Sequence, residues 1–331
     1  MTGVVALHQR DFGWVRKGRK KMQKKVLIAV DQSNHAREAI KYAARMGALI
    51  KDIGFVLFHV QPMISQYIVE EARTKPKARS QLEALRKKNH QAALDLLENC
   101  KTRLTEMGVA AECIELRTGP RDAGVADDII YAAEAGKYDA VLIGRRGLSA
   151  FQELFVGSVT TNLVVHAKQI PVWLVDGTVS CDNVLIAVDG SVNSLRALDH
   201  MVFMLSESPK PKIELLHIKP KLGDYCEIDM GDMEADTLSQ AMENANQRCL
   251  TDFRAQALKM LKDAGFTDSQ INFRQVEKRL SPAKAITEEL QKGDFGTLVI
   301  GKHGMSKSQF MGRVAGTVVQ KIQDRAVWIV P

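Results

Sequence analysis

Short apolar runs alternate along this chain with stretches of helical periodicity. The apolar runs are strand-sized, continuous and rich in β-branched residues, as in Val26–Val30, which is typical of strands buried on both faces of a parallel sheet. After Asp31, apolar residues return at helical spacing from Ala36 to Ile50, and Ser33 or Asn34 is placed to cap that helix. In the first half of the chain we predict strands at 26–30, 55–60, 109–117, 138–143 and 172–175, and further helices at 123–135 and 159–167.

This alternation predicts an α/β fold, because right-handed crossovers between parallel strands place helices on both faces of the sheet. In such a fold ligands bind beyond the C-terminal ends of the strands, where the strand order reverses. A longer helix is predicted from about Arg79, with Leu82, Leu85, Ala92, Leu96, Cys100 and Leu104 on one side.

The chain also contains an internal repeat. Residues 26–33, Val-Leu-Ile-Ala-Val-Asp-Gln-Ser, return at 184–191 with seven identities in eight at an offset of 158. Later runs return at nearly the same offset, which indicates a tandem duplication: 55–62 at 213–220, 140–144 at 297–301, and 172–175 at 327–330. We therefore predict two tandem doubly wound domains, each a five-stranded, mostly parallel sheet with helices on both faces. The predicted boundaries are a flexible arm at 1–24, a first domain at 25–177 and a second domain at 178–331.

Most of the net charge lies in the arm. The chain carries 46 basic and 39 acidic residues, a formal charge of +7, and residues 1–25 hold eight of the basic and one of the acidic residues. The other positions therefore carry 38 of each, so the charge gives no reason to expect a fold that binds nucleic acid. Two interpretations of the arm stay open: a solvated tail, or a segment that docks on an anionic partner.

Composition excludes several other classes. A chain of 331 residues with 45% apolar and 26% charged residues is neither disordered nor fibrous. No apolar run approaches the roughly 18 residues that cross a bilayer, and the first residues do not form a secretory signal, so we expect a cytoplasmic protein without a membrane partner. The five cysteines are scattered and never form a Cys-x-x-Cys pair, which indicates reduced thiols rather than disulfides or a zinc site.

A glycine pattern follows the fourth predicted strand. It consists of Gly144-x2-Gly147, then nine residues, then Gly157-Ser158 at the start of a helix. Glycine lets the backbone approach a ligand closely, and a helix N-terminus offers free amides and the positive end of the dipole to an anion. The pattern is a candidate phosphate site, although glycines after a strand are also common turn residues.

Ionisable residues near the pattern allow more than one interpretation. Arg145 and Arg146 could add charge to a phosphate site or be solvated loop residues. Asp31 ends the first strand at the same edge of the sheet, where its carboxylate could accept hydrogen bonds from ribose hydroxyls or cap the next helix. His59 and His217 lie inside strands, which favours hydrogen-bonded core residues over catalytic ones. We recognise no nucleophile–base or metal-ligand motif, and assign no catalytic residue and no metal.

Taken together, these features resemble the universal stress protein family, each half being similar to one UspA domain. The resemblance rests on Val26–Asp31 with Ser33, on His59-Val60 with Pro62, on the glycine pattern and on 171–175, and it covers nearly everything except the arm. In that family the pattern G-x2-G-x9-G-[ST] marks members that bind ATP. The resemblance implies an ATP site formed by Ala29, Val30, Asp31, Val60, Ile143, Gly144, Arg146, Gly147, Gly157, Ser158, Val159 and Thr160. It further implies that Asp31 lies near the ribose, the backbone of Val60 meets adenine, and 157–160 hold the phosphates.

The second half departs from this pattern. Only seven residues separate Gly304 from Gly312, Arg313 stands in place of the serine, and Ala315 stands where Thr160 stood. The candidate second site comprises Ala187, Val188, Asp189, Ile218, Gly301, His303, Gly304, Gly312 and Arg313. We expect asymmetry: the first half binds ATP, whereas the second binds it weakly, binds AMP or ADP, or is empty.

Family members pair through the strand that ends each domain, here 172–175 and 327–330. An exposed apolar edge needs a partner, so in a tandem chain the two strands can pair in an intrachain pseudo-dimer, and two chains can associate further as a homodimer. Trp173 and Trp328 contribute either to that contact or only to the core.

The resemblance implies an ATP-binding protein of the stress response that acts as a nucleotide-dependent regulator on a protein partner that the sequence does not name. Two alternatives stay open. One is a slow ATPase or autophosphorylating protein with Ser158 and Thr160 as phosphate acceptors, and the other is a nucleotide-free scaffold whose basic arm engages an anionic partner. Mg²⁺ would arrive with the triphosphate, because this ion prefers substrate oxygens and few protein ligands.

Overall fold

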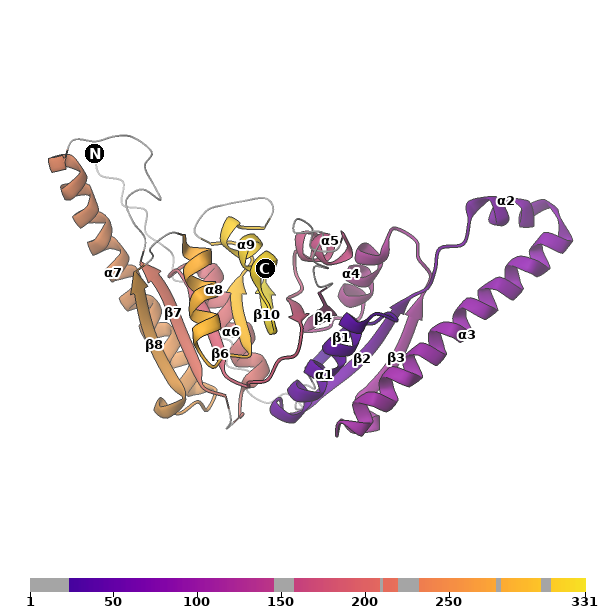
Figure 1. Ribbon diagram of the computed structural model, residues 1–331, viewed down its shortest axis with the longest axis horizontal. Helices are drawn as coiled ribbons and strands as arrows, with labels where there is room; N and C mark the ends of the chain where they lie inside the picture. Colours follow the sequence, from indigo (N-terminus) through magenta and orange to yellow (C-terminus); the bar gives the residue numbers. More distant parts are fainter. Residues whose placement is uncertain (1–23, 146–157, 209–210, 220–231, 278–280, 305–310) are drawn as a thin grey trace.

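One ten-stranded sheet runs through both halves of the protein (Figure 1). The computed structural model describes residues 24–145, 158–208, 211–219, 232–277, 281–304 and 311–331. Their strands follow the order β3-β2-β1-β4-β5-β10-β9-β6-β7-β8, and neighbours are parallel except at the antiparallel pair β5–β10. The predicted α/β fold, a tandem pair of mostly parallel sheets with helices on both faces, is confirmed.

The second half repeats the element order of the first, without a counterpart of α2 among the described residues. The first half contains β1 (Lys24–Ala29), α1 (Asn34–Leu49), β2 (Ile53–Val60), α2 (Gln66–Thr74), α3 (Pro76–Glu106), β3 (Ile114–Gly119), α4 (Val125–Ala135), β4 (Ala140–Gly144), α5 (Ser158–His166) and β5 (Val172–Asp176). The second half contains β6 (Val184–Val188), α6 (Val192–Leu205), β7 (Ile213–Lys219), α7 (Asp232–Asp263), β8 (Ile271–Glu277), α8 (Pro282–Lys292), β9 (Thr297–Gly301), α9 (Arg313–Lys321) and β10 (Arg325–Val330).

Helices cover both faces of the sheet and bury a separate core on each. Val26 and Ile28 of β1 pack with α1 and α3, whereas Leu27 and Ala29 pack with α4 and α5. Successive strand side chains point to opposite faces, so a strand buried on both faces must be apolar at every position. In the second half α6 and α7 take the first face, and α8 and α9 take the other.

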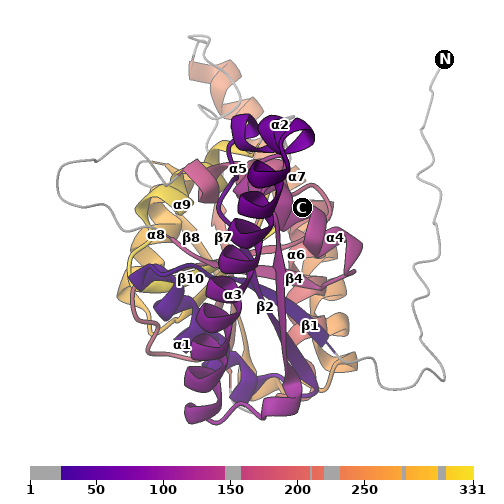
Figure 2. The same cartoon turned by 90° about the vertical axis from the view of Figure 1, so that its right-hand side faces the viewer.

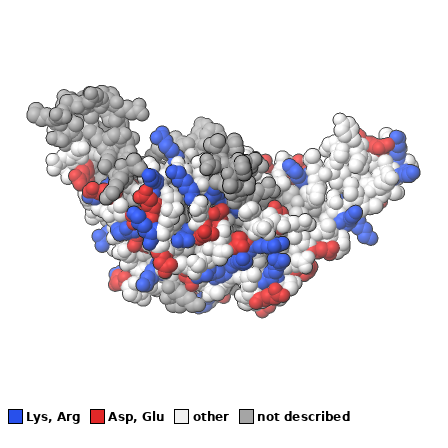
Figure 3. Space-filling model, viewed as in Figure 1, with Lys and Arg blue, Asp and Glu red and all other residues white. Residues whose placement is uncertain are grey.

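The face of the molecule in Figure 3 carries cations and anions interspersed over its described surface. The second half and the region around α1 show the same mixture, with blue and red side chains next to one another. This distribution agrees with the equal numbers of basic and acidic residues outside the arm.

The long helix α3 differs from its prediction. It begins at Pro76, and α2 packs against its N-terminal part beyond the edge of the sheet (Figures 1 and 2). Leu82 is buried there, but nearer the sheet the buried residues are Ala93 and Leu97, while Ala92 is exposed. The predicted single stripe was wrong in its middle, because the two parts of α3 pack against different partners and bury different faces.

The third strand also begins later than predicted, at Ile114 rather than at residue 109. Gly108 has a φ of 94°, a left-handed conformation that favours glycine, and a 3₁₀ turn at Ala111–Cys113 follows it. These two turns hold the chain out of the sheet until Ile114.

The two halves meet where β5 pairs with β10. Trp173 lies opposite Trp328 in the register, and their rings stack with centroids 3.9 Å apart at an interplanar angle of 2°. The Trp173 indole donates to Nε2 of His200 on α6 (3.0 Å), and the Trp328 indole donates to the hydroxyl of Tyr42 on α1 (2.9 Å). The predicted intrachain pairing of the edge strands is confirmed, and both tryptophans serve the contact and the core together.

His200 makes this junction sensitive to acid. Burial lowers its pKa from 6.5 to about 3, so the unfolded chain binds a proton between these values that the folded chain does not. The contribution of His200 to stability is therefore present above pH 6.5 and is lost as the pH falls from there toward about 3, by up to about 1.4 kcal/mol per pH unit. Between pH 6.5 and 4.5 we expect the wild-type protein to lose about 2 to 3 kcal/mol more unfolding free energy than His200→Gln.

Glutamine keeps an acceptor for the Trp173 indole and does not titrate, so urea unfolding of both proteins at the two pH values isolates the histidine. Equal losses of unfolding free energy in the two proteins between pH 6.5 and 4.5 would show that His200 does not cause the loss of stability in acid.

Candidate functional site

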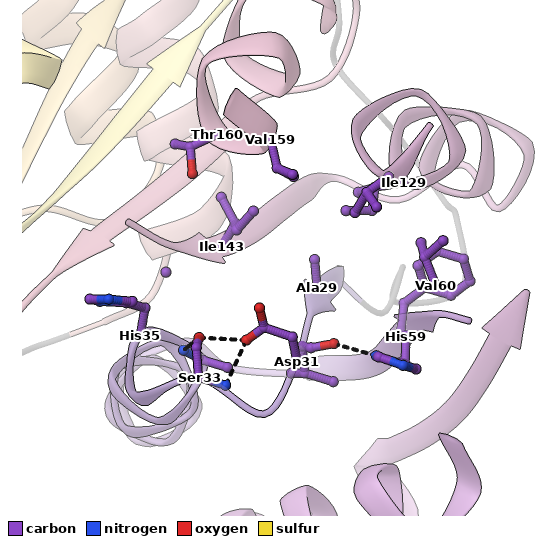
Figure 4. Close-up of a pocket in the computed structure, with 15 residues that line it drawn as sticks. Ala29, Asp31, Ser33, His35, His59, Val60, Ile129, Ile143, Val159 and Thr160 are labelled. Carbon is purple, nitrogen blue, oxygen red and sulfur yellow. Dashed lines mark hydrogen bonds between the residues drawn. The ribbon is translucent and has the colours of Figure 1, made fainter. Parts of the chain in front are cut away.

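A cavity of about 200 Å³ lies at the C-terminal ends of β1, β2 and β4 (Figure 4). This is where the strand order reverses between β1 and β4, the position at which doubly wound sheets bind ligands. Its lining comprises Ala29, Val30, Asp31, Ser33, His35, Ala36, Phe58, His59, Val60, Val125, Ile129, Ile143, Gly144, Val159 and Thr160.

Eight of the residues predicted for the first site line this one cavity: Ala29, Val30, Asp31, Val60, Ile143, Gly144, Val159 and Thr160. Arg146, Gly147 and Gly157 lie outside the described residues. Ser158 is the first residue of α5, and its side chain is not among those that the structure describes. The structure therefore places the ends of β1, β2 and β4 and the first turn of α5 around one cavity. The contacts of these residues with a ligand stay predictions.

Asp31 has a fixed orientation at this cavity. Its Oδ1 accepts hydrogen bonds from the Ser33 backbone N–H (2.9 Å) and hydroxyl (2.5 Å), and the Ser33 hydroxyl accepts from Ala36 N (3.3 Å). The helix cap is thus Ser33, and Asp31 orients that cap rather than capping α1 itself. Figure 4 shows the carboxylate directed into the cavity, where it can accept hydrogen bonds from a bound hydroxyl.

One wall of the cavity is apolar. Phe58 and Val60 come from the end of β2, and Val125 and Ile129 come from the start of α4. Sequence reasoning missed Phe58 and the two α4 residues, because only the packing of α4 onto the sheet places them here. The apolar slot that these four side chains line suits a flat aromatic group of a ligand.

His59 is a hydrogen-bonded strand residue, as predicted, and also lines the cavity. Its Nδ1 lies 2.8 Å from the carbonyl oxygen of Val30, and His217 makes the matching contact with Val188 at 2.9 Å. Both imidazoles tie the ends of neighbouring strands together, and within the described part of the chain neither forms a hydrogen bond with a Ser, Thr or Cys side chain.

Gly144 has a structural role that the sequence did not indicate. A Cβ atom at this position would lie 2.1 Å from the carbonyl oxygen of His35 in α1. The end of β4 thus packs directly on the first turn of α1, and this backbone contact excludes any side chain. The close approach that requires glycine here is to α1 rather than to a ligand.

Arg145 is neither a solvated residue nor part of the cavity. It is 3% exposed, and its guanidinium donates to the carbonyls of Gln320 (2.8 Å) and Ile322 (2.5 Å) at the C-terminal end of α9 in the second half. Both interpretations offered for Arg145 were therefore wrong, because the residue after β4 faces the neighbouring domain.

The second predicted site is arranged differently. Ala187, Val188 and Asp189 end β6, Ile218 lies in β7, and Gly301, His303 and Gly304 follow one another from the end of β9, with Gly312 and Arg313 at the start of α9. A Cβ on Gly304 would lie 2.9 Å from Oδ2 of Asp189, and the Gly312 N–H donates to the carbonyl of Lys302 (2.8 Å). The Asn193 amide donates to the Gly304 carbonyl (3.3 Å).

These contacts hold the two described ends of the loop between β9 and α9 close to each other, and they hold its first end against the Asp189 carboxylate. The charge differs as well, because burial and the neighbouring Lys302 lower the pKa of His303, whereas Arg146 at the matching position is a permanent cation. Arg313 is exposed, and Ala315 lacks the hydroxyl of Thr160.

Two further findings concern the residues that the structure describes. They contain no cluster of three or more His, Cys, Asp or Glu side chains that could hold a metal ion. Among the described helices, none is long and apolar enough to cross a membrane.

Fold and cavity together define a duplicated, doubly wound α/β protein with a cavity at the switch point of its first half. The Universal stress protein family matches residues 22–176 and 181–331, and the chain belongs to this family. A universal stress protein of Mycolicibacterium smegmatis is 23% identical over 306 residues, which cover 91% of this chain and 94% of that protein.

Solved structures of tandem length share the fold. A universal stress protein from Archaeoglobus fulgidus DSM 4304 superposes with a TM-score of 0.61 at 18% identity, covering 93% of this chain and 98% of the other. A protein of unknown function from Pseudomonas aeruginosa PAO1 superposes with a TM-score of 0.57 at 15% identity, covering 93% and 92%.

Proposed function

We propose that the first domain binds ATP and that the protein acts in the stress response as a nucleotide-dependent regulator. The observation that carries this proposal is the cavity itself, which joins three features that an adenine nucleotide needs. These are an apolar slot, an oriented carboxylate and a helix N-terminus.

Each feature suits one part of the nucleotide. The slot formed by Phe58, Val60 and Ile129 would take the adenine ring. The Asp31 carboxylate would accept hydrogen bonds from the ribose hydroxyls. The first turn of α5, with the buried Thr160, would offer backbone amides and a hydroxyl to the phosphates, because helix N-terminal amides have no partner within the helix.

We expect the second domain to bind ATP more weakly or to take a smaller ligand such as AMP or ADP. In that domain Gly304 lies against Asp189, and the start of α9 lacks the hydroxyl corresponding to Thr160. The carboxylate that would meet a ribose is therefore in contact with its own motif loop.

The matched variants Asp31→Asn and Asp189→Asn test this proposal in the full chain. Asparagine keeps an oxygen acceptor for Ser33 or Ser191 but loses the charge that strengthens a hydrogen bond to a ribose hydroxyl, an interaction worth about 1.5 kcal/mol or more. Calorimetric titration should show ATP affinity reduced about tenfold by Asp31→Asn and nearly unchanged by Asp189→Asn. Equal losses in both variants would remove the asymmetry, and full affinity in Asp31→Asn would exclude this carboxylate from the site.

A further inference from the structure

Lys302 reaches from the second domain into the first. It directly follows β9, and its ammonium donates hydrogen bonds of 2.7 Å to the carbonyl oxygens of both Val165 and Ala167. These carbonyls lie at the C-terminal end of α5, where the last four carbonyls have no partner within the helix. Lys302 is 3% exposed, so this contact is a buried cation on the negative end of a helix.

The opposite end of α5 lines the cavity that we propose as the nucleotide site. Val159 and Thr160 lie in its first turn and line the cavity (Figure 4). The helix has nine residues, about 13 Å, and two and a half turns of hydrogen-bonded backbone move as one rigid unit. A group that fixes the C-terminal end of α5 therefore also fixes the amides that would meet the phosphates.

Arg145 makes the matching contact in the other direction. It follows β4 as Lys302 follows β9, and its guanidinium donates hydrogen bonds to the carbonyl oxygens of Gln320 and Ile322 at the end of α9. Its backbone continues directly from Gly144, which lines the cavity. The loop start and the helix of the first site are thus both anchored on the second domain.

We infer that Lys302 is a positioning residue for the nucleotide site of the first domain, although it belongs to the second. This inference rests on the proposed function. Loss of the ammonium removes this donor from the buried Ala167 carbonyl and the partly buried Val165 carbonyl, and it frees α5 to shift. Such a shift weakens the contacts of the N-terminal amides of α5 with phosphate. Contacts with adenine and ribose, made by β1, β2 and α4, do not depend on this anchor.

The experiment compares ATP with adenosine in calorimetric titrations of the full chain. Lys302→Met should weaken ATP binding about fivefold or more, the range of ordinary coupling between sites, and leave adenosine binding unchanged. Lys302→Arg, which keeps a buried cation with several donors, should restore ATP affinity. Lys321→Met, an exposed lysine in the last turn of α9, is the matched control and should behave as wild type. Should Lys302→Met fail to fold, Lys302→Gln carries the same expectation, because it loses the charge and keeps only the shorter amide NH₂ group as a donor.

Hydrogen exchange locates the effect. ATP should protect the amides of α5 in the wild-type chain, and Lys302→Met should reduce that protection. Unchanged ATP affinity, an equal loss for ATP and adenosine, or a loss of protection in α9 instead of α5 would each overturn the inference. A wild-type chain that binds no ATP would overturn the proposed function on which it rests.

Discussion

Replacing Trp328 with alanine is expected to lower the free energy of unfolding by about 3 to 5 kcal/mol, the range for large aromatic side chains removed from a core. Trp328 has no exposed surface, stacks on Trp173 at 3.9 Å and donates to the Tyr42 hydroxyl. Because these contacts join the two halves, we also expect the variant to unfold in two transitions where the wild-type protein unfolds in one. Urea unfolding followed by far-UV circular dichroism measures both effects.

Tyr131→Ala provides the control, since this aromatic residue on α4 is 75% exposed. It should change the unfolding free energy by less than about 0.5 kcal/mol. If the unfolding free energy of Trp328→Ala lies within about 1 kcal/mol of the wild-type value, the effect is on the order of an ordinary surface change. That result would show that the stacked pair does not hold the domains together.

Gly144→Ala is the second substitution with a large expected effect. The added Cβ would lie 2.1 Å from the His35 carbonyl oxygen, so β4 and α1 must move apart. Overpacking of this kind costs about 3 kcal/mol when backbone has to shift, and it should also weaken ATP binding because both elements line the cavity. Thermal unfolding and ATP titration of the variant measure the two losses.

Gly301→Ala is the matched variant in the second domain. There the nearest atom to the added Cβ is the His303 carbonyl oxygen at 2.9 Å, a milder contact within the motif loop itself. We expect a loss of about 1 kcal/mol and unchanged ATP affinity in the first domain. An equal or larger loss for Gly301→Ala would contradict the account of why Gly144 is a glycine.

The sequence was sufficient for the architecture because the fold depends on local patterns. The run Val26–Val30 is apolar at every position since both faces of the sheet are buried there, and its return at 184–188 predicted the tandem repeat. The α3 stripe was less predictable, because a helix of 31 residues packs against two different partners. Periodicity within one helix cannot reveal a change of partner.

Part of the candidate site was predictable for the same reason. Asp31, Gly144 and Thr160 follow strands or begin a helix at the C-terminal edge of a parallel sheet, so their proximity follows from topology. Ile129 could not be assigned, because its place at the cavity depends on how α4 packs across the strands. Arg145 and Lys302 were beyond sequence reasoning as well, since their partners are carbonyls 135 to 177 residues away.

A crystal structure of the full chain grown with saturating ATP would decide whether the cavity of the first domain binds this nucleotide. We predict adenine between Val60 and Ile129, ribose at the Asp31 carboxylate, and phosphates at the first turn of α5. A cavity that holds only water at saturating ATP, or that side chains have closed, would contradict this prediction.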